Sequence, residues 1–263
     1  MSNASASARE RWQAKNQTIG RLLGTGHVAE VFEWGSCVLK LYKSTIAKPT
    51  AFREAAVHAA AEAFGLPVPK VWSVQEIGGR WGVVFDRVKL PSFAEQMLSN
   101  PDEVQQYVEC IVRLHMRVHA LPAVHLADLK VRLTDNIVAT GVLAEPRRRD
   151  LLEGIARMPD GDRLCHGDFH PMNILGEPSP VIIDWPDARR GDPAADVCRS
   201  YLLMKLHAAE IATTYLDGYC RAAGISRQAV SSWLPYLAAA RLAEHVPGEL
   251  DDLLKIVDTY PLD

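Results

Sequence analysis

Residues 164–175 read Leu-Cys-His-Gly-Asp-Phe-His-Pro-Met-Asn-Ile-Leu, with an acid, Asp168, five positions before an amide, Asn173. The apolar segments 174–175 and 181–183 flank a stretch that contains Gly and Pro, and this pattern predicts a β-hairpin that ends at Asp184. The hairpin would bring Asp184 beside Asn173. Carboxylate and amide oxygens are ligands that Mg²⁺ prefers in proteins. The stretch therefore predicts a loop acid followed by a magnesium-binding pair.

A glycine-rich segment lies far upstream, where residues 24–31 read Gly-Thr-Gly-His-Val-Ala-Glu-Val. Gly24 and Gly26 fit a loop whose backbone approaches phosphates closely. A dinucleotide-binding fingerprint would open a helix, whereas this segment runs into a predicted hairpin that turns near residues 33–36. It also lacks the Gly-Lys-Ser/Thr ending of a P-loop. The pattern favours a glycine-rich loop between two strands.

The return strand, residues 38–42, carries Lys40 among apolar residues. Residues 50–64 are rich in strong helix formers and end before Gly65, so a helix is predicted there. This helix carries Glu54 and, two turns later, Glu62; the resemblance described next implies that Glu54 orients Lys40, with Glu62 as the alternative.

Taken in order, these motifs resemble the aminoglycoside phosphotransferase superfamily. The resemblance rests on His166-Gly-Asp-Phe-His-Pro-Met-Asn173, Ile183-Asp-Trp185 and Arg190-Gly-Asp-Pro-Ala-Ala-Asp196, and it spans nearly the whole chain. The spacing of Asp168 and Asn173 also matches the catalytic loop of protein kinases. Members of this superfamily are similar in fold to protein kinases and phosphorylate hydroxyls of small molecules.

The resemblance implies ATP, with GTP as an alternative, and Mg²⁺ as cofactors, and it implies a role for each matching residue. Asp168 would orient and deprotonate the acceptor hydroxyl. The other assignments are Gly24, Gly26 and Lys40 for the phosphates; Glu54 to orient Lys40; Val31 and Val38 for the adenine; Asn173 and Asp184 for Mg²⁺; His166 and Asp196 to support the loop; and Asp187 and Asp192 as candidate substrate contacts.

The expected architecture is α+β with two lobes. A small N-terminal lobe, residues 1–87, would hold an antiparallel sheet with further strands at 70–74 and 81–85 and one helix. A larger lobe, residues 88–263, would be mainly helical, with helices from residue 100 onward, over 147–158 and in three segments after Pro193. Nucleotide would bind between the lobes.

Composition sets further bounds. The 263 residues carry a net charge of −3 and are 48% apolar, which excludes a disordered chain and gives no electrostatic signal for nucleic acid or an anionic membrane. We expect no membrane span, because charges interrupt the longer apolar stretches, and no secretory signal at the polar N-terminus. Five scattered cysteines indicate reduced thiols and a cytoplasmic protein. The sequence does not indicate the oligomeric state.

Alternatives stay open at this point. His166-x-Asp168-x-His170 could be a metal-hydrolase cluster, but that interpretation leaves Lys40 and Asn173 without a role. Only eleven residues separate Asp184 from Asp196, which is short for the activation segment of a protein kinase. A catalytically silent nucleotide-binding module is the non-enzymatic alternative.

The acceptor could be an aminoglycoside or a metabolite such as choline, a sugar, an amino alcohol or a vitamin precursor. Acids of the superfamily's late helices bind cationic drugs, although such a cluster is more often a solvated helix face. The acids in question are Glu244, Glu249, Asp251, Asp252, Asp258 and Asp263.

Overall fold

The computed structural model describes residues 18–123 and 125–260. They divide into two compact units. The first comprises the described residues of Met1–Pro91 together with Leu175–Pro186, and the second comprises those of Ser92–Ile174 and Asp187–Asp263. The segment Leu175–Pro186 therefore leaves the second unit and returns to the first, whereas the sequence-based division assigned all of 88–263 to one lobe.

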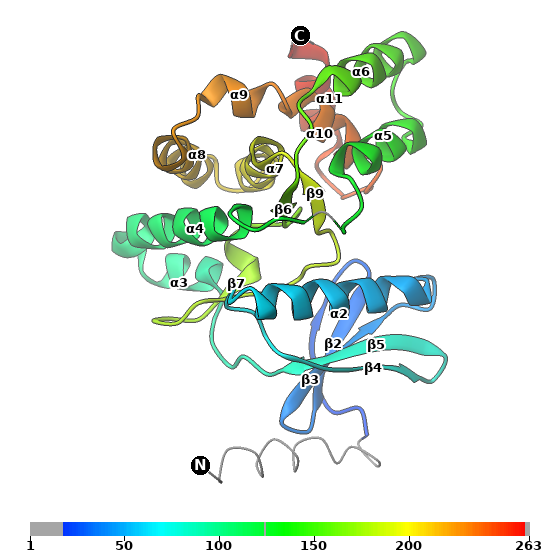
Figure 1. Ribbon diagram of the computed structural model, residues 1–263, viewed down its shortest axis with the longest axis vertical. Helices are drawn as coiled ribbons and strands as arrows, with labels where there is room; N and C mark the ends of the chain where they lie inside the picture. Colours follow the sequence, from blue (N-terminus) through cyan, green and yellow to red (C-terminus); the bar gives the residue numbers. More distant parts are fainter. Residues whose placement is uncertain (1–17, 124, 261–263) are drawn as a thin grey trace. The chain divides into compact units, whose positions relative to one another are not determined.

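The first unit is built on a five-stranded antiparallel sheet in the order β1-β2-β3-β5-β4. Helix α2 (Lys48–Ala63) lies along one face of this sheet (Figure 1). The strands are β1 (Leu22–Thr25), β2 (Ala29–Trp34), β3 (Cys37–Tyr42), β4 (Val71–Ile77) and β5 (Arg80–Asp86).

Strand β3 shows how sequence alternation builds the sheet. Cys37, Leu39 and Leu41 are buried on the face that also carries Trp34 and Val84. Tyr42 points to the opposite face, where it packs with Ala51 and Ala55 of α2. Because side chains alternate along a strand, Lys40 shares the face of Tyr42 and is directed toward helix α2.

The hairpin between β2 and β3 turns through Gly35 and Ser36, with Trp34 and Cys37 paired at its end. Gly35 has φ +59°, a conformation that a side chain disfavours. This confirms the predicted hairpin, and the helix predicted over 50–64 is present as α2.

The returning segment pairs strand β8 (Val181–Ile182) with β7 (Ile174–Leu175), as the hairpin prediction required. Backbone hydrogen bonds attach it to the first unit: Ile182 N donates to Pro67 O (2.7 Å) and Gly176 N to Pro91 O (2.9 Å). These long-range bonds explain why the segment belongs to the first unit although it lies far along the chain.

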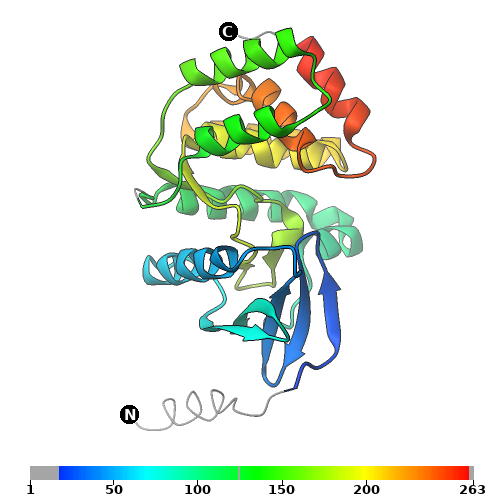
Figure 2. The same ribbon diagram turned by 90° about the vertical axis from the view of Figure 1, so that its right-hand side faces the viewer.

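The second unit is mainly helical. Its helices are α3 (Phe93–Ser99), α4 (Val104–His119), α5 (Leu129–Ala139), α6 (Glu145–Arg157), α7 (Pro193–Lys205), α8 (Ala209–Ala223), α9 (Arg227–Ser231), α10 (Leu234–Leu242) and α11 (Leu250–Thr259), with 3₁₀ turns at Pro101–Glu103 and Pro171–Asn173. Helix α10 packs against α5, α7 and α11 (Figure 2).

Several of these helices differ from expectation. The region after Pro193 holds five helices, α7 to α11, rather than three, because turns at residues 224–226 and 232–233 divide the apolar stretches. Helices α3 and α5 were not predicted. Helix α3 begins with a capping box, in which Ser92 Oγ accepts from Glu95 N and Glu95 Oε2 accepts from Ser92 N.

Two short strands of the second unit, β6 (Arg163–Cys165) and β9 (Arg189–Gly191), pair antiparallel. Strand β6 runs directly into His166, and β9 leads into the start of α7. The pairing therefore places residues 166–168 beside the first turn of α7. In the described part of the chain, every helix is too short or too polar to cross a bilayer.

Candidate functional site

Lys40 is the centre of the polar cluster in the first unit. Its Nζ lies 2.7 Å from Glu54 Oε1 and 2.6 Å from Asp184 Oδ1. Burial alone would lower the pKa of Lys40, but the charges of Glu54 and Asp184 outweigh it and hold that pKa above its usual value. The ammonium is therefore charged and fixed between two carboxylates.

Glu54 is fully buried on α2. Besides Lys40 it has a partner that the sequence did not suggest, Tyr42, whose hydroxyl donates to Glu54 Oε2. Tyr42 follows Lys40 by two positions, so both side chains reach the same carboxylate from the same face of β3. The alternative partner, Glu62, is exposed at the far end of α2.

Asp184 follows strand β8 with φ +67°, a left-handed conformation that is strained for a residue other than glycine. The next residue, Trp185, is fully buried, and its Nε1 donates to Ile182 O at 3.4 Å. This buried indole holds the turn, while the Asp184 side chain remains 40% exposed. A strained, anchored and accessible carboxylate is suited to binding a cation.

The glycine-rich loop connects β1 and β2. Gly26 N donates to Ala29 O (2.8 Å), which closes the turn, and a Cβ at Gly24 would meet no atom within 4 Å. Val31 and Val38 lie on the neighbouring strands β2 and β3, and both are half-buried.

Asp168 lies in the second unit, in the loop between β6 and the 3₁₀ turn Pro171–Asn173. Asn173 Nδ2 donates to both the backbone O and the Oδ2 of Asp168 at 2.9 Å, and His170 Nε2 lies 3.4 Å from Oδ1. Burial works to raise the pKa of Asp168, but the hydrogen bond from His170 and the charges of His170 and Arg199 hold it well below its usual range. Asp168 is therefore a carboxylate at neutral pH.

The loop before Asp168 is held by hydrogen bonds from its backbone to the carboxylate of Asp196. Its Oδ2 accepts from His166 N (2.6 Å) and its Oδ1 from Gly167 N (2.8 Å). Gly167 has φ +81°, and a Cβ there would lie 2.6 Å from Asp187 O, so only glycine fits. Asp196 thus binds the backbone of the two residues that precede Asp168, and its supporting role stays a prediction.

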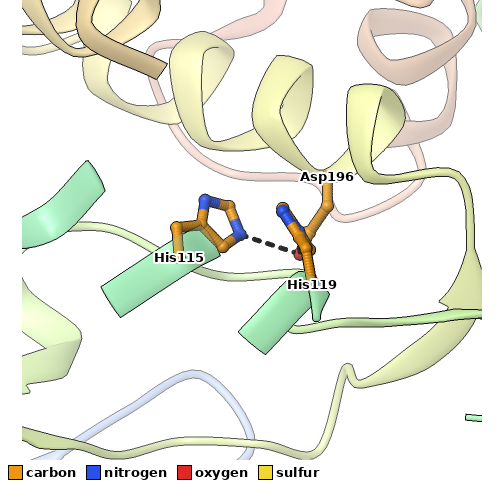
Figure 3. A group of neighbouring side chains, drawn as sticks. All are labelled: His115, His119 and Asp196. Atoms are coloured by element: carbon orange, nitrogen blue, oxygen red, sulfur yellow. Dashed lines mark hydrogen bonds and ion pairs between the residues drawn. The ribbon is translucent and has the colours of Figure 1, made fainter. Parts of the chain in front are cut away.

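Two histidines of α4 complete the support of this carboxylate, and the sequence analysis missed their role. Figure 3 shows both imidazoles directed at Asp196: His115 Nε2 is 3.0 Å and His119 Nε2 3.1 Å from Oδ2. Their Nδ1 atoms meet Tyr215 OH (2.6 Å) and Tyr219 OH (2.7 Å) of α8. The spacing of four residues, which puts both imidazoles on one helix face, was the available signal.

The trio of His115, His119 and Asp196 has the composition of a metal site, since its ligand atoms lie within 4.8 Å of one another. A hydrogen-bond network explains the same geometry. If both histidines are neutral and protonated on Nε2, they donate to Asp196 and accept from the two tyrosines. Burial, followed by the neighbouring His119, lowers the pKa of His115 to about 3, consistent with a neutral ring.

The two candidate substrate acids have different surroundings. Asp187 Oδ1 is bonded to Arg132 of α5. Asp192 caps helix α7, with Oδ1 accepting from Ala194 N (2.9 Å) and Oδ2 from Trp233 Nε1 (3.3 Å). Asp187 thus borders the loop of Asp168, whereas both oxygens of Asp192 are used within the fold.

The late acids are also distributed differently from a single solvated cluster. The two carboxylate oxygens of Glu244 accept hydrogen bonds from Arg199 Nη2 at 2.8 and 2.9 Å, and Glu244 also forms an ion pair with Arg241. Glu249 accepts from Arg241 Nε and Nη2 at 2.7 and 2.8 Å. Asp251, Asp252 and Asp258 are exposed on α11, and Asp263 lies outside the described residues.

The expected magnesium ligands have suitable donor atoms. Asp184 offers a partly exposed carboxylate. The amide nitrogen of Asn173 is directed at Asp168, which leaves its carbonyl oxygen as the group available to a cation. Both are hard oxygen donors, so they fit Mg²⁺.

Known proteins share features of this chain. The family model described as "Phosphotransferase enzyme family" (APH) matches residues 28–236. No curated protein sequence matches significantly.

Several solved structures share the fold. A thermostable mutant of the aminoglycoside phosphotransferase APH(4)-Ia in its apo form is 17% identical, with a TM-score of 0.67 over 95% of this chain and 96% of that chain. An aminoglycoside-3'-phosphotransferase of type VIII is 19% identical, with a TM-score of 0.59 over 92% and 97%. A ternary complex of streptomycin, ATP and APH(2")-IIa is 16% identical, with a TM-score of 0.61 over 97% of both chains. The expected α+β, kinase-like fold is thereby confirmed.

Proposed function

Because this chain belongs to the phosphotransferase enzyme family, we propose that it transfers the γ-phosphate of ATP to a hydroxyl group of a small molecule. Family membership makes the chain a phosphotransferase with an alcohol group as acceptor. What is proposed in addition is the phosphate donor, the role of each residue and the chemical class of the acceptor. Nucleotide complexes of fold relatives, such as the one with AMP-PNP and hygromycin B, support ATP as the donor.

The observation that carries the proposal is Lys40 held between Glu54 and Asp184, at 2.7 and 2.6 Å. A lysine fixed by a buried glutamate can present a rigid positive charge to nucleotide phosphates. The second unit supplies the complementary part, an ionised Asp168 whose oxygen is oriented by Asn173.

Each residue then has a defined task. Lys40 binds the α- and β-phosphates, and Glu54 with Tyr42 fixes its position. Gly24 and Gly26 leave room for phosphates against the loop backbone, and Val31 and Val38 pack on the adenine.

Asp168 orients the acceptor hydroxyl and accepts its proton as the bond to phosphorus forms. A strong base is not needed, because a loose phosphoryl-transfer transition state develops little proton transfer early. His166 and Asp196 hold the loop so that Asp168 keeps one position. Asp184 of the first unit and Asn173 of the second would each offer an oxygen ligand to Mg²⁺, which would neutralise phosphate charge when bound with the nucleotide.

The acceptor is either an aminoglycoside or a metabolite, and a catalytically silent nucleotide-binding module remains the rival class. We also infer a cytoplasmic location, because the proposed donor is ATP and the five cysteines form no disulfide bond.

The deciding experiment measures ADP release by the purified chain with Mg²⁺-ATP and a panel of acceptors. Phosphate transfer is expected to at least one hydroxyl compound, and at a rate lower by about 10²- to 10⁴-fold in Asp168→Ala. Magnesium-dependent ATP consumption that no acceptor stimulates would instead support the silent module. Phosphate transfer at the wild-type rate by Asp168→Ala would remove Asp168 from the mechanism.

A further inference from the structure

A small polar pocket lies beside the catalytic loop in the second unit. We call it the two-arginine pocket, and its polar lining consists of Arg132, Asn136, Gly167, Asp187, Asp196, Arg199 and Glu244. Leucines of α5 and α10 form its apolar wall. Its free volume of about 20 Å³ admits one or two water-sized groups, such as a hydroxyl or a hydroxymethyl arm.

The pocket lies next to Asp168 in the chain, through Gly167, and its two arginines interact electrostatically with the Asp168 carboxylate. Arg199 contributes to the lowered pKa of Asp168 and donates through Nε to Gly167 O at 3.3 Å. Burial lowers the pKa of Arg132, but the charges of Asp187, Glu244 and Asp168, in decreasing order, outweigh it and hold that pKa above its usual value. A group bound in this pocket would therefore be close to the residue proposed to accept the hydroxyl proton.

Each acid that lines the two-arginine pocket already has a partner within the fold. Arg132 is paired with Asp187, and Arg199 with Glu244 in a geometry where one nitrogen contacts both oxygens. The Glu244 carboxylate also receives Arg241. Asp196 also lines the pocket, and its carboxylate oxygens are in contact with two peptide N–H groups and two histidines. Among the residues that the structure describes, the pocket thus offers no acid without a cationic or N–H partner.

This pairing of the acids decides which ligand chemistry fits. An ammonium group would have to displace Arg132 or Arg199 from its acid, and would leave a largely buried guanidinium unpaired. A hydroxyl can donate to a carboxylate and accept from a guanidinium without breaking either pair. Paired arginines and acids are thus suited to hydroxyls and poorly suited to a polycation.

We propose that the two-arginine pocket is an acceptor subsite for a hydroxyl group, and that the acceptor is an uncharged sugar or polyol rather than a polycationic aminoglycoside. The inference rests on the proposed function and specifies the substrate class of that site.

The first test compares acceptors that share a ring but differ in charge. Purified full-length protein with Mg²⁺-ATP is given D-glucose against D-glucosamine and myo-inositol against streptamine, with kanamycin and hygromycin B as polycations. We expect kcat/KM to favour each uncharged member by about tenfold, the effect of one unfavourable charge placement. Equal or better transfer to the amino compounds or the drugs overturns the inference and leaves the proposed function standing. Absence of transfer to every compound counts against the proposed function, and so against the inference that rests on it.

The second test removes the cation that is paired with Asp187 and measures binding instead of turnover. Arg132→Gln leaves Asp187 without its cation, so kanamycin should bind about tenfold more tightly in calorimetry than it does to the wild type. Arg132→Lys, which keeps the charge, should retain weak binding. Arg227→Gln is the matched control, because it removes an exposed arginine that pairs with Asp217 away from the pocket. An affinity gain no larger in Arg132→Gln than in Arg227→Gln would contradict the inference.

Discussion

At the scale of single residues, the two sites differ in how they hold their charges. Asp168 is kept ionised by cationic neighbours, and its oxygens are oriented by Asn173 and His170. Lys40 is kept charged by two carboxylates, one of which is fully buried. Removing the Asp168 carboxylate should therefore affect catalysis, whereas removing the Lys40 ammonium should affect folding stability.

Asp168→Ala should reduce kcat by about 10²- to 10⁴-fold, the usual contribution of a positioned general base. Nucleotide affinity should stay at the wild-type value, because the proposed phosphate contacts come from Lys40 and the glycine-rich loop. Single-turnover kinetics and calorimetry with ADP separate the two effects. A large loss of ADP affinity would show that Asp168 has another role.

Lys40→Met should destabilise the fold by about 3–5 kcal/mol, because it leaves the buried Glu54 carboxylate without its cation. Urea unfolding at pH 7 measures this loss. The double variant Lys40→Met/Glu54→Gln removes the uncompensated charge and should recover part of the stability. If the double variant is less stable than Lys40→Met, burial of the Glu54 charge is not the cause.

At the scale of helices and strands, the loop that carries Asp168 depends on helices that do not contain it. The pairing of β6 with β9 brings the loop to the first turn of α7, and α4 and α8 contribute the histidines and tyrosines around Asp196. A polar network of this kind stabilises the fold only while each member keeps its protonation state.

His115 gives that requirement a pH dependence. Its pKa is about 3 in the folded protein, against about 6.5 for an ordinary histidine, so the unfolded chain binds a proton that the folded one does not. Stability should therefore be fully present above about pH 6.5 and fall as the pH drops toward 3, by up to about 1.4 kcal/mol per pH unit from this group.

The measurement is the free energy of unfolding in urea between pH 7 and 4.5. In His115→Gln the slope of the unfolding free energy against pH should be smaller, by an amount that corresponds to the uptake of about one proton on unfolding. His207→Gln is the control, because its side chain is 73% exposed, and it should keep the wild-type slope. An unchanged slope in His115→Gln would mean that His115 also titrates in the folded protein.

The contact between α6 and α10 gives a packing prediction. A Cβ at Gly154 would lie 2.3 Å from the hydroxyl oxygen of Tyr236, which is fully buried. Gly154→Ala should therefore lose about 1–3 kcal/mol through overpacking, despite the better helix propensity of alanine. Gly218→Ala on α8 is the comparison, since its Cβ would meet Val112 at 3.2 Å, and it should be clearly less destabilising. Thermal unfolding that ranks the two variants in the opposite order would refute the packing argument.

At the scale of the whole molecule, each compact unit contributes part of the proposed chemistry. The first unit holds the lysine, its partners and Asp184, and the second holds Asp168 and Asn173. A ligand that binds only the folded chain should raise its overall stability, whichever unit it contacts.

Mg²⁺-ADP at a hundred times its Kd should stabilise the chain by about 2.7 kcal/mol. Chelation of Mg²⁺ should remove part of the accompanying rise in Tm in the wild type. In Asp184→Asn, which weakens the proposed metal ligand, chelation should make little further difference. A wild-type Tm shift that is the same with and without Mg²⁺ would argue against the assigned metal ligands.

The motifs with local spacing were predictable from sequence. The hairpin that presents Lys40, the helix with Glu54, the pairing of β7 with β8 and the kinase-like fold follow from alternation, helix formers and motif order, because each depends on residues near one another in the chain. The division of the helical region was predicted less well. Apolar periodicity alone does not show where a helix stops, and the unpredicted α3 begins at a capping box that required attention to Ser92 and Glu95.

The sequence by itself determined the family, the fold class and the candidate residues, since these depend on residue type and on spacing along the chain. Only the tertiary structure decided what surrounds them: Tyr42 against Glu54, the two histidines against Asp196, and the return of residues 175–186 to the first unit. It also paired Asp187 and Glu244 with arginines from distant helices. The physical reason is that charge balance and burial depend on groups brought together by packing, and their separation in sequence carries no signal of that contact.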